Sequence, residues 1–101
     1  MKTFKFYTKE KGIVETDNFK DIKNITYHRL DGPAVISYYD NGSIAYEIYM
    51  IDGIRHRLDG PALIYYNRNG YIVYTQHYIN NHYYTWVDYE KEILKLKVNL
   101  L

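Results

Sequence analysis

The sequence contains no cysteine, which excludes a disulfide framework, a thiolate zinc site and a thiol nucleophile. Without cysteine there is no reason to read the chain as secreted. Long apolar runs are also missing, because no segment approaches the roughly 20 apolar residues that a membrane span requires. Lysines interrupt the apolar pairs of the N-terminus, which therefore lacks the apolar core of a signal peptide. We expect a soluble protein located in the cytoplasm, with no membrane span.

Tryptophan occurs once and phenylalanine three times, whereas tyrosine occurs 14 times. Tyrosine suits a pleated, half-buried surface on which the ring packs and the hydroxyl stays wet, so we expect an all-β chain. Neither sign of charge dominates the 101 residues, whose net charge is +1. Residues 28–86 hold four arginines against five acidic residues, a balance of −1 that weighs against tracking a phosphate backbone.

The phrase HRLDGPA occurs at residues 28–34 and again at residues 56–62. Residues 28–55 and 56–83 agree at 14 of 28 positions, which identifies an internal repeat. We predict one domain, an elongated, twisted antiparallel sheet built from about three β-hairpins. Its units are a degenerate N-terminal hairpin (1–27), repeat 1 (28–55), repeat 2 (56–83) and a C-terminal helical cap (84–101). In the N-terminal unit, residues 5–7 and 12–14 echo the first and return strands of the later copies.

Identity between the two copies has a period of two. On the first strand, residues 34, 36 and 38 recur while residues 35, 37 and 39 vary. On the return strand, residues 44 and 46 recur while residues 45, 47 and 49 vary. Because successive side chains of a strand point to opposite faces, we predict that the recurring side chains are buried and the varying ones exposed.

The same pattern predicts the turns. A three-residue loop at residues 40–42 pairs Tyr38 with Ile44 and Ile36 with Tyr46, and it places Gly42 in the left-handed conformation. The second connection changes from Asp-Gly at residues 52–53 to Asn-Asn in the next copy. Asparagine tolerates positive φ, so we expect the geometry of this turn to be kept.

After the repeats, apolar residues recur with a period close to 3.6 from Trp86 onward. Thr85 and Asp88 have the spacing of a helix N-cap, and we predict a short helix. Its apolar stripe consists of Trp86, Tyr89, Ile93 and Leu96. This stripe would close the open end of the sheet as a cap.

Three phrases of the chain resemble the MORN-type repeat, in a variant form built around DGPA, YY.NG and Y..G. They are HRLDGPA, Tyr-Tyr-Asp-Asn-Gly and Tyr-Met-Ile-Asp-Gly-Ile-Arg-His, and the resemblance covers about residues 28 to 83. It implies successive β-hairpins stacked into an antiparallel sheet. Chains of the variant type occur in bacteria, where some are labelled antitoxin components, and in phages and large viruses. If the chain is viral, its location would be the host cytoplasm.

The phrase HRLD offers a histidine, a guanidinium and a carboxylate, yet two such sets are a poor metal site. We favour a structural role, in which the arginines pair with the aspartates or stack on tyrosines. The alternative is that the two HRLD sets, stacked in successive repeats, form a functional site. Ser37 and Ser43 are the only serines, and neither has the context of a nucleophile. We therefore expect no enzyme activity, no catalytic residue, no metal and no cofactor.

The varying face is the predicted binding surface, rich in the tyrosine and arginine of binding hot spots. The predicted partner-binding residues are Tyr39, Tyr49, Arg55, Tyr65, Arg68, Tyr71, His77 and Tyr83. We predict a protein-binding module, in its most concrete form a small inhibitor or antitoxin-like protein, such as an anti-defence or anti-CRISPR protein, that masks a partner's site. The alternatives are a single-stranded nucleic-acid binder that stacks bases on tyrosine, and a self-associating structural repeat protein, for instance a homodimer.

Overall fold

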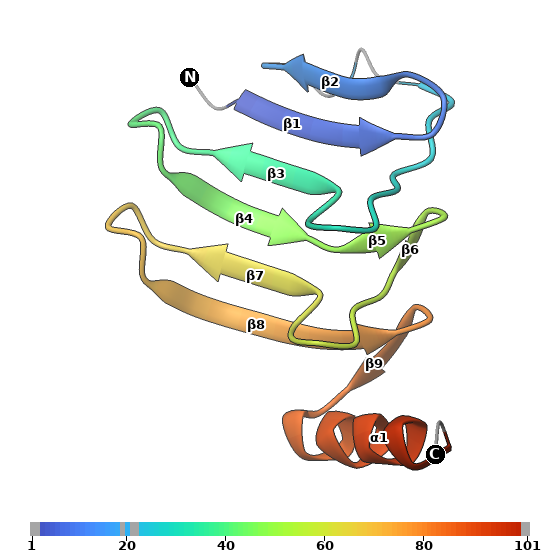
Figure 1. Ribbon diagram of the computed structural model, residues 1–101. Helices are drawn as coiled ribbons and strands as arrows, with labels where there is room; N and C mark the ends of the chain where they lie inside the picture. Colours follow the sequence, from blue (N-terminus) through green and yellow to red (C-terminus); the bar gives the residue numbers. More distant parts are fainter. Residues whose placement is uncertain (1–2, 19, 21–22, 100–101) are drawn as a thin grey trace.

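The computed structural model describes residues 3–18, 20 and 23–99, and one antiparallel sheet dominates it (Figure 1). Predictions that concern residues 1, 2, 19, 21, 22, 100 and 101 lie outside the described residues. The seven strands of the sheet have the order β2-β1-β3-β4-β7-β8-β9, and β5 pairs separately with β6. The elements are β1 (Thr3–Thr8), β2 (Gly12–Thr16), β3 (Val35–Tyr38), β4 (Ile44–Ile48), β5 (Met50–Ile51), β6 (Ile54–Arg55), β7 (Leu63–Tyr66), β8 (Ile72–Ile79), β9 (His82–Tyr84) and α1 (Trp86–Asn99). The predicted all-β class with a short C-terminal helix is confirmed.

The two long hairpins end in the predicted three-residue loops. Gly42 has φ 87° and Gly70 has φ 88°, values that side chains with a Cβ rarely adopt. In the first loop the Gly42 N–H donates to the Tyr39 carbonyl at 3.0 Å. Tyr38 pairs with Ile44, as the sequence predicts.

The two-residue turns that follow β5 and β8 also share one geometry. Asp52 and Gly53 have φ of 52° and 79°, and Asn80 and Asn81 have φ of 49° and 68°. Two successive positive φ values are the mark of a type I′ turn. The expectation that the turn keeps its backbone geometry when Asn-Asn replaces Asp-Gly is confirmed.

Beyond the loop, the pairing of β3 with β4 departs from the prediction. Tyr46 pairs with Ser37 and not with Ile36, because the register shifts between Ser37 and Tyr38. Such a shift is a β-bulge, in which one strand carries an extra residue. An extra residue exchanges the two faces of β4 relative to β3. The pair β7 and β8 has the same shift, between Tyr65 and Tyr66.

The bulge defines two faces that differ from the predicted ones. Pairing and alternation place Phe4, Phe6, Tyr46, Tyr65 and Tyr74 on one face, which we call the aromatic face. We call the opposite face the corner face, because the arginines of the two HRLDGPA segments stack on its tyrosines. It carries Tyr7, Ile36, Glu47, Tyr49, Ile64, Thr75 and His77. Recurring residues of the first strand therefore share the corner face with varying residues of the return strand.

The prediction that recurring side chains are buried and varying ones exposed holds for the recurring Ala34, Ile36, Ala62 and Ile64, which are buried, but it is wrong as a general rule. The varying Ser37 is 1% exposed, and the varying Val35 and Ala45 are buried as well. Conversely, the recurring Ile72 is 59% exposed. The position of a strand in the sheet decides its burial: β3 lies between β1 and β4, whereas the loop end of β8 has β7 on one side and no described strand on the other.

The N-terminal unit is shifted in phase relative to the prediction. Phe6 of β1 lies opposite Val35, as Ile48 of β4 lies opposite Leu63. β1 is therefore a return strand, equivalent to β4 and β8. The predicted match of residues 5–7 to a first strand is wrong, because the pairing partner defines the unit and the spacing between glycines does not.

The helix α1 has the predicted cap: the Asp88 N–H donates to Thr85 Oγ1 at 3.2 Å. Tyr89 is buried, and its hydroxyl donates to the Arg57 carbonyl at 2.7 Å. Trp86, in contrast, is 62% exposed, so the predicted apolar stripe is wrong at this position. The helix lies beside β9 at the end of the sheet, as predicted for a cap (Figure 1).

Candidate functional site

The two HRLDGPA segments, which we call the corners, hold their arginines in the same way. The Arg29 guanidinium lies over the Tyr7 ring with its Cζ 3.9 Å from the ring centroid. Its Nε donates to Asp31 Oδ1 at 3.0 Å and its Nη1 to the Pro33 carbonyl at 3.2 Å. The second corner repeats these contacts, with Arg57 stacked 3.8 Å from the centre of the Tyr49 ring. Each corner is thus fastened to the sheet by a cation-π contact.

The corner histidines fix the neighbouring turns. His28 Nδ1 accepts the Asp52 N–H at 2.9 Å, and His56 Nδ1 accepts the Asn80 N–H at 3.0 Å. Histidine, arginine and aspartate of each corner therefore all have structural partners. These contacts support the structural interpretation of the HRLD phrase.

The glycine of each corner makes room for the guanidinium. A Cβ on Gly32 would lie 2.7 Å from Arg29 Cζ, closer than real Cβ contacts occur. At Gly60 the corresponding distance to Arg57 Cζ is 2.9 Å. Any side chain at these positions would displace the arginine from its place over the tyrosine.

Neighbouring cations lower the pKa of three carboxylates, one in the first corner and two in the loops and turns. A hydrogen bond and the charge of Arg29 lower the pKa of Asp31, and those of Arg68 lower the pKa of Asp40. The pKa of Asp52 is lowered by its hydrogen bond to Lys9. A general acid near neutral pH requires a raised carboxyl pKa, so these groups favour pairing over proton transfer.

A tyrosine and a glutamate meet on the corner face. The Tyr66 hydroxyl donates to Glu47 Oε1 at 2.5 Å. Burial, followed by this hydrogen bond and the nearby negative charge, raises the pKa of Tyr66 to about 12. The phenol therefore stays protonated at neutral pH, and the pair joins β7 to β4.

The predicted residues Tyr39 and Arg68 connect the tips of successive hairpins. The Tyr39 hydroxyl donates to the Tyr66 carbonyl at 2.6 Å. The Arg68 guanidinium lies 4.9 Å from the centre of the Tyr39 ring and pairs with Asp40. Both side chains are thus engaged within the protein.

The aromatic face carries a row of stacked rings. The ring centroids of Tyr46 and Tyr65 are 5.4 Å apart, and those of Tyr65 and Tyr74 are 5.9 Å apart. The row crosses β4, β7 and β8. Tyr65 is 38% exposed and Tyr74 is 48% exposed, so the row ends in rings that solvent reaches.

An apolar hollow of about 320 Å³ lies beside this row. It is lined by Phe4, Phe6, Tyr27, Val35, Tyr46, Ile48, Met50 and Arg55. Arg55 Nη1 donates to the Tyr78 hydroxyl at 3.2 Å, which holds the guanidinium at the rim. A hollow with apolar walls and one cation suits an apolar side chain of a partner.

The predicted binding residues do not form one surface. Arg55, Tyr65 and Tyr83 belong to the aromatic face, Tyr49 and His77 to the corner face, and Tyr39, Arg68 and Tyr71 to the loop ends of the hairpins. The prediction of a single varying face is wrong because the bulge separates its two halves. Sequence reasoning misses Tyr46 and Tyr74, because both recur between the copies and recurrence predicts burial.

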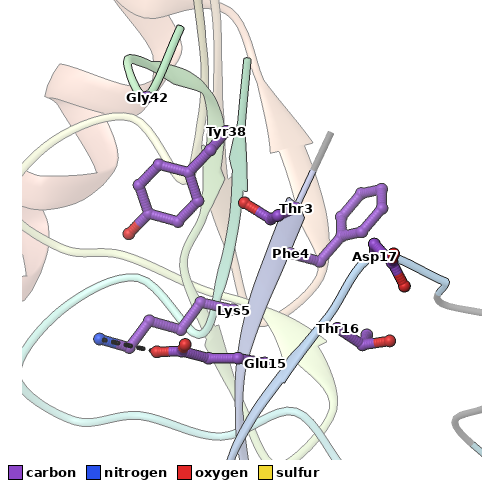
Figure 2. Close-up of a pocket in the computed structure, with 8 residues that line it drawn as sticks. All are labelled: Thr3, Phe4, Lys5, Glu15, Thr16, Asp17, Tyr38 and Gly42. Carbon is purple, nitrogen blue, oxygen red and sulfur yellow. Dashed lines mark ion pairs between the residues drawn. The ribbon is translucent and has the colours of Figure 1, made fainter. Parts of the chain in front are cut away.

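Another hollow, of about 690 Å³, is lined by residues of β1, β2 and β3 and by Gly42 of the first hairpin loop (Figure 2). Phe4 and Asp17 lie on one side of β1, while Lys5 and Tyr38 lie on the other. Lys5 Nζ is 3.9 Å from Glu15 Oε1, and of this ion pair Glu15 is exposed while Lys5 is half-buried. Apart from this pair, the polar side chains that line this hollow do not point toward one another as a binding site requires, so we assign no chemistry to it.

Within residues 3–18, 20 and 23–99, no three His, Asp or Glu side chains are grouped as metal ligands would be. In the same residues, no helix combines the length and the apolar character needed to cross a membrane. Comparisons of the chain with protein-family models, curated proteins and solved structures gave no match. The resemblance to the MORN-type repeat therefore stays a prediction.

Proposed function

We propose that this protein is a non-enzymatic protein-binding module and that the aromatic face is its contact surface. The observation that carries the proposal is the row of Tyr46, Tyr65 and Tyr74, which ends in two partly exposed rings. Tyrosine is enriched among residues that dominate binding energy. Because neighbouring rings hold each other in place, these side chains lose little freedom on binding.

The hollow beside the row supports the same proposal. Its walls include Phe6, Ile48 and Met50, so a partner's apolar side chain would be removed from water there. The partly exposed Tyr65 ring and the hollow lie on the same face of the sheet. This combination of an aromatic anchor and a pocket is common in protein interfaces.

The resemblance to variant MORN-type repeats guides the choice of partner class. We propose a small inhibitor or antitoxin-like protein of viral, phage or bacterial origin, which acts in the cytoplasm and masks a site on another protein. An anti-defence protein, such as an anti-CRISPR protein, is one form of this activity. The near-neutral net charge of +1 fits a protein partner better than a polyanion.

The proposal is tested by photo-crosslinking in cells that naturally express the protein. A benzophenone amino acid replaces Tyr65 on the aromatic face or, as the matched control, Leu30 on the first corner, which is 79% exposed. We expect a defined crosslinked protein from position 65 and none from position 30. Equal crosslinking from both positions would contradict the assignment of the face.

Single-stranded nucleic acid is the rival partner, and salt distinguishes it. Arg55 is the one cation among the residues that line the hollow, so the aromatic face lacks a basic track for phosphates. We expect no tight binding of a single-stranded oligonucleotide. Tight binding that weakens steeply as salt rises would overturn the proposal in favour of this rival.

A further inference from the structure

The strand β8 has an open edge at Tyr74, Thr75 and Gln76. On one side of these residues β8 pairs with β7. On the other side β9 pairs only with residues 77–79, and no other described strand is present. Figure 1 shows β8 at the lower border of the sheet, with α1 below only its C-terminal part. Backbone groups along an open edge are available to another strand.

The equivalent edge is filled twice within the chain itself. Residues 46, 47 and 48 of β4 pair with residues 65, 64 and 63 of β7. On β1, residues 4, 5 and 6 receive residues 37, 36 and 35 of β3 in the same register. The equivalent residues of β8 are Tyr74, Thr75 and Gln76. The structure thus displays two examples of the strand that fits this edge.

Hydrogen bonds show which backbone groups of β8 point outward. The Gln76 carbonyl accepts the Ala62 N–H at 2.9 Å, so the backbone of Gln76 faces β7. Because alternate residues of a strand bond to opposite neighbours, the N–H and carbonyl of Thr75 face the open side. His77 holds the place of Tyr49, whose N–H donates to the Ala62 carbonyl at 2.7 Å.

The composition of this edge does not protect it. Residues 72–76 contain no charged residue and no proline, which are the usual safeguards of an edge strand. The opposite edge of the sheet differs, because β2 carries Glu15 with 71% of its side chain exposed. The two edges are therefore chemically distinct, and only the β8 edge is suited to receive a strand.

We propose that the open edge of β8 binds an extended segment of another protein as an additional antiparallel strand. The segment has the pattern shared by residues 34–38 and 62–66: alanine, an aliphatic residue, isoleucine, a fourth residue that varies, and tyrosine. The isoleucine lies opposite Thr75 on the corner face, as Ile64 lies opposite Glu47. An aromatic fourth residue lies opposite Tyr74 and extends the row of tyrosine rings. The strand pairs through the backbone of β8, so the inference does not rest on the proposed function, although the side chain of Tyr74 belongs to the aromatic face.

In the register that pairs the two Thr75 residues, a second copy of the chain does not fit as the occupant through its own β8. If the two Thr75 residues were paired antiparallel, Val73 of the second copy would fall opposite His77. Tyr84 of β9 already occupies that place. The occupant is therefore a short strand that turns away before this point, as β7 does after the second corner.

The test uses a peptide with the sequence Pro-Ala-Leu-Ile-Tyr-Tyr-Asn, taken from residues 61–67, with two lysines added at its C-terminus for solubility. The matched control is the same peptide with a methyl group on the isoleucine nitrogen. We expect the unmodified peptide to bind the full chain and to slow hydrogen exchange of the Thr75 amide. Methylation removes one inter-strand hydrogen bond and obstructs the approach of the strand, so we expect affinity to fall at least about tenfold.

Two variants of the protein complete the test. Thr75→Pro removes the outward N–H and is expected to abolish peptide binding, whereas Thr75→Val keeps this N–H and is expected to bind within about threefold of the original chain. If the proline variant fails to fold, the comparison of the two peptides still decides. Equal affinity of both peptides, no binding of either, or a homodimer that protects the Thr75 amide without peptide would each overturn the proposal.

Discussion

The replacement Gly32→Ala isolates the fastening of the first corner. Gly32 has a negative φ, so alanine fits its backbone, and the three atoms nearest to the new methyl group all belong to Arg29. The guanidinium must then leave its place over Tyr7. We therefore expect alanine at position 32 to destabilise the fold by breaking the contacts of Arg29, and not by straining the backbone.

The size of the effect follows from the contacts that Arg29 loses. The cation-π contact with Tyr7 contributes about 1 kcal/mol. The charged hydrogen bond to the Pro33 carbonyl contributes about 1.5 kcal/mol. The exposed ion pair with Asp31 adds little. Alanine offsets about 0.5 kcal/mol by restricting the unfolded chain, which leaves a net loss of about 2 kcal/mol.

Urea unfolding of a double-mutant cycle measures this loss. We expect Gly32→Ala to lower the free energy of unfolding by about 2 kcal/mol, which corresponds to a fall in Tm of about 8–16 °C for a domain of this size. In an Arg29→Ala background, the same replacement should cost nothing or stabilise slightly. If Gly32→Ala destabilises both backgrounds equally, the steric reasoning is refuted, because the cost would not depend on the guanidinium.

Three further outcomes are expected. Gly42→Val should lower the free energy of unfolding by about 1–2 kcal/mol, because φ is 87° and a Cβ there would touch nothing within 4 Å, whereas Gly42→Asn should cost less in the same urea assay. Burial lowers the pKa of His77, so folding favours its neutral form: stability should fall as the pH drops below about 6.5 through the folded-state pKa, and His77→Tyr should flatten this part of a Tm-against-pH curve. The raised pKa of Tyr66 gives stability that is complete below pH 10 and lost as the pH rises toward about 12; Tyr66→Phe should remove that part of the alkaline slope in urea unfolding.

Local features of the backbone could be predicted from the sequence because each depends on a few adjacent residues. The left-handed glycine at Gly42 follows from the loop length, and the Asn80-Asn81 turn follows from the tolerance of asparagine for positive φ. The cap at Thr85 follows from its spacing to Asp88. In each case the physical cause lies within about four residues of the effect.

The orientation of the faces could not be predicted, because it depends on one extra residue in the pairing. The bulge near Tyr38 leaves no sign in the repeat, since both copies contain it and the substitutions therefore keep their period of two. Comparing the sequences of two copies shows which residues are identical, but it does not show a backbone irregularity that both copies contain. Recurrence therefore predicts a buried Tyr46, although its ring belongs to the row of rings that leads to solvent.

The end of the repeat array shows how the fold closes one surface and leaves another open. At the position where Tyr7 and Tyr49 receive an arginine, β8 carries His77, and the Tyr89 ring of α1 lies 4.5 Å from it. Thr85 stands where a third corner would place its arginine, so the chain enters a helix there. The Tyr89 ring of the helix covers His77 on the corner face, yet the helix supplies no strand to pair with Thr75. Because covering a face and pairing an edge require different elements, a helical cap leaves the edge of β8 available to another chain.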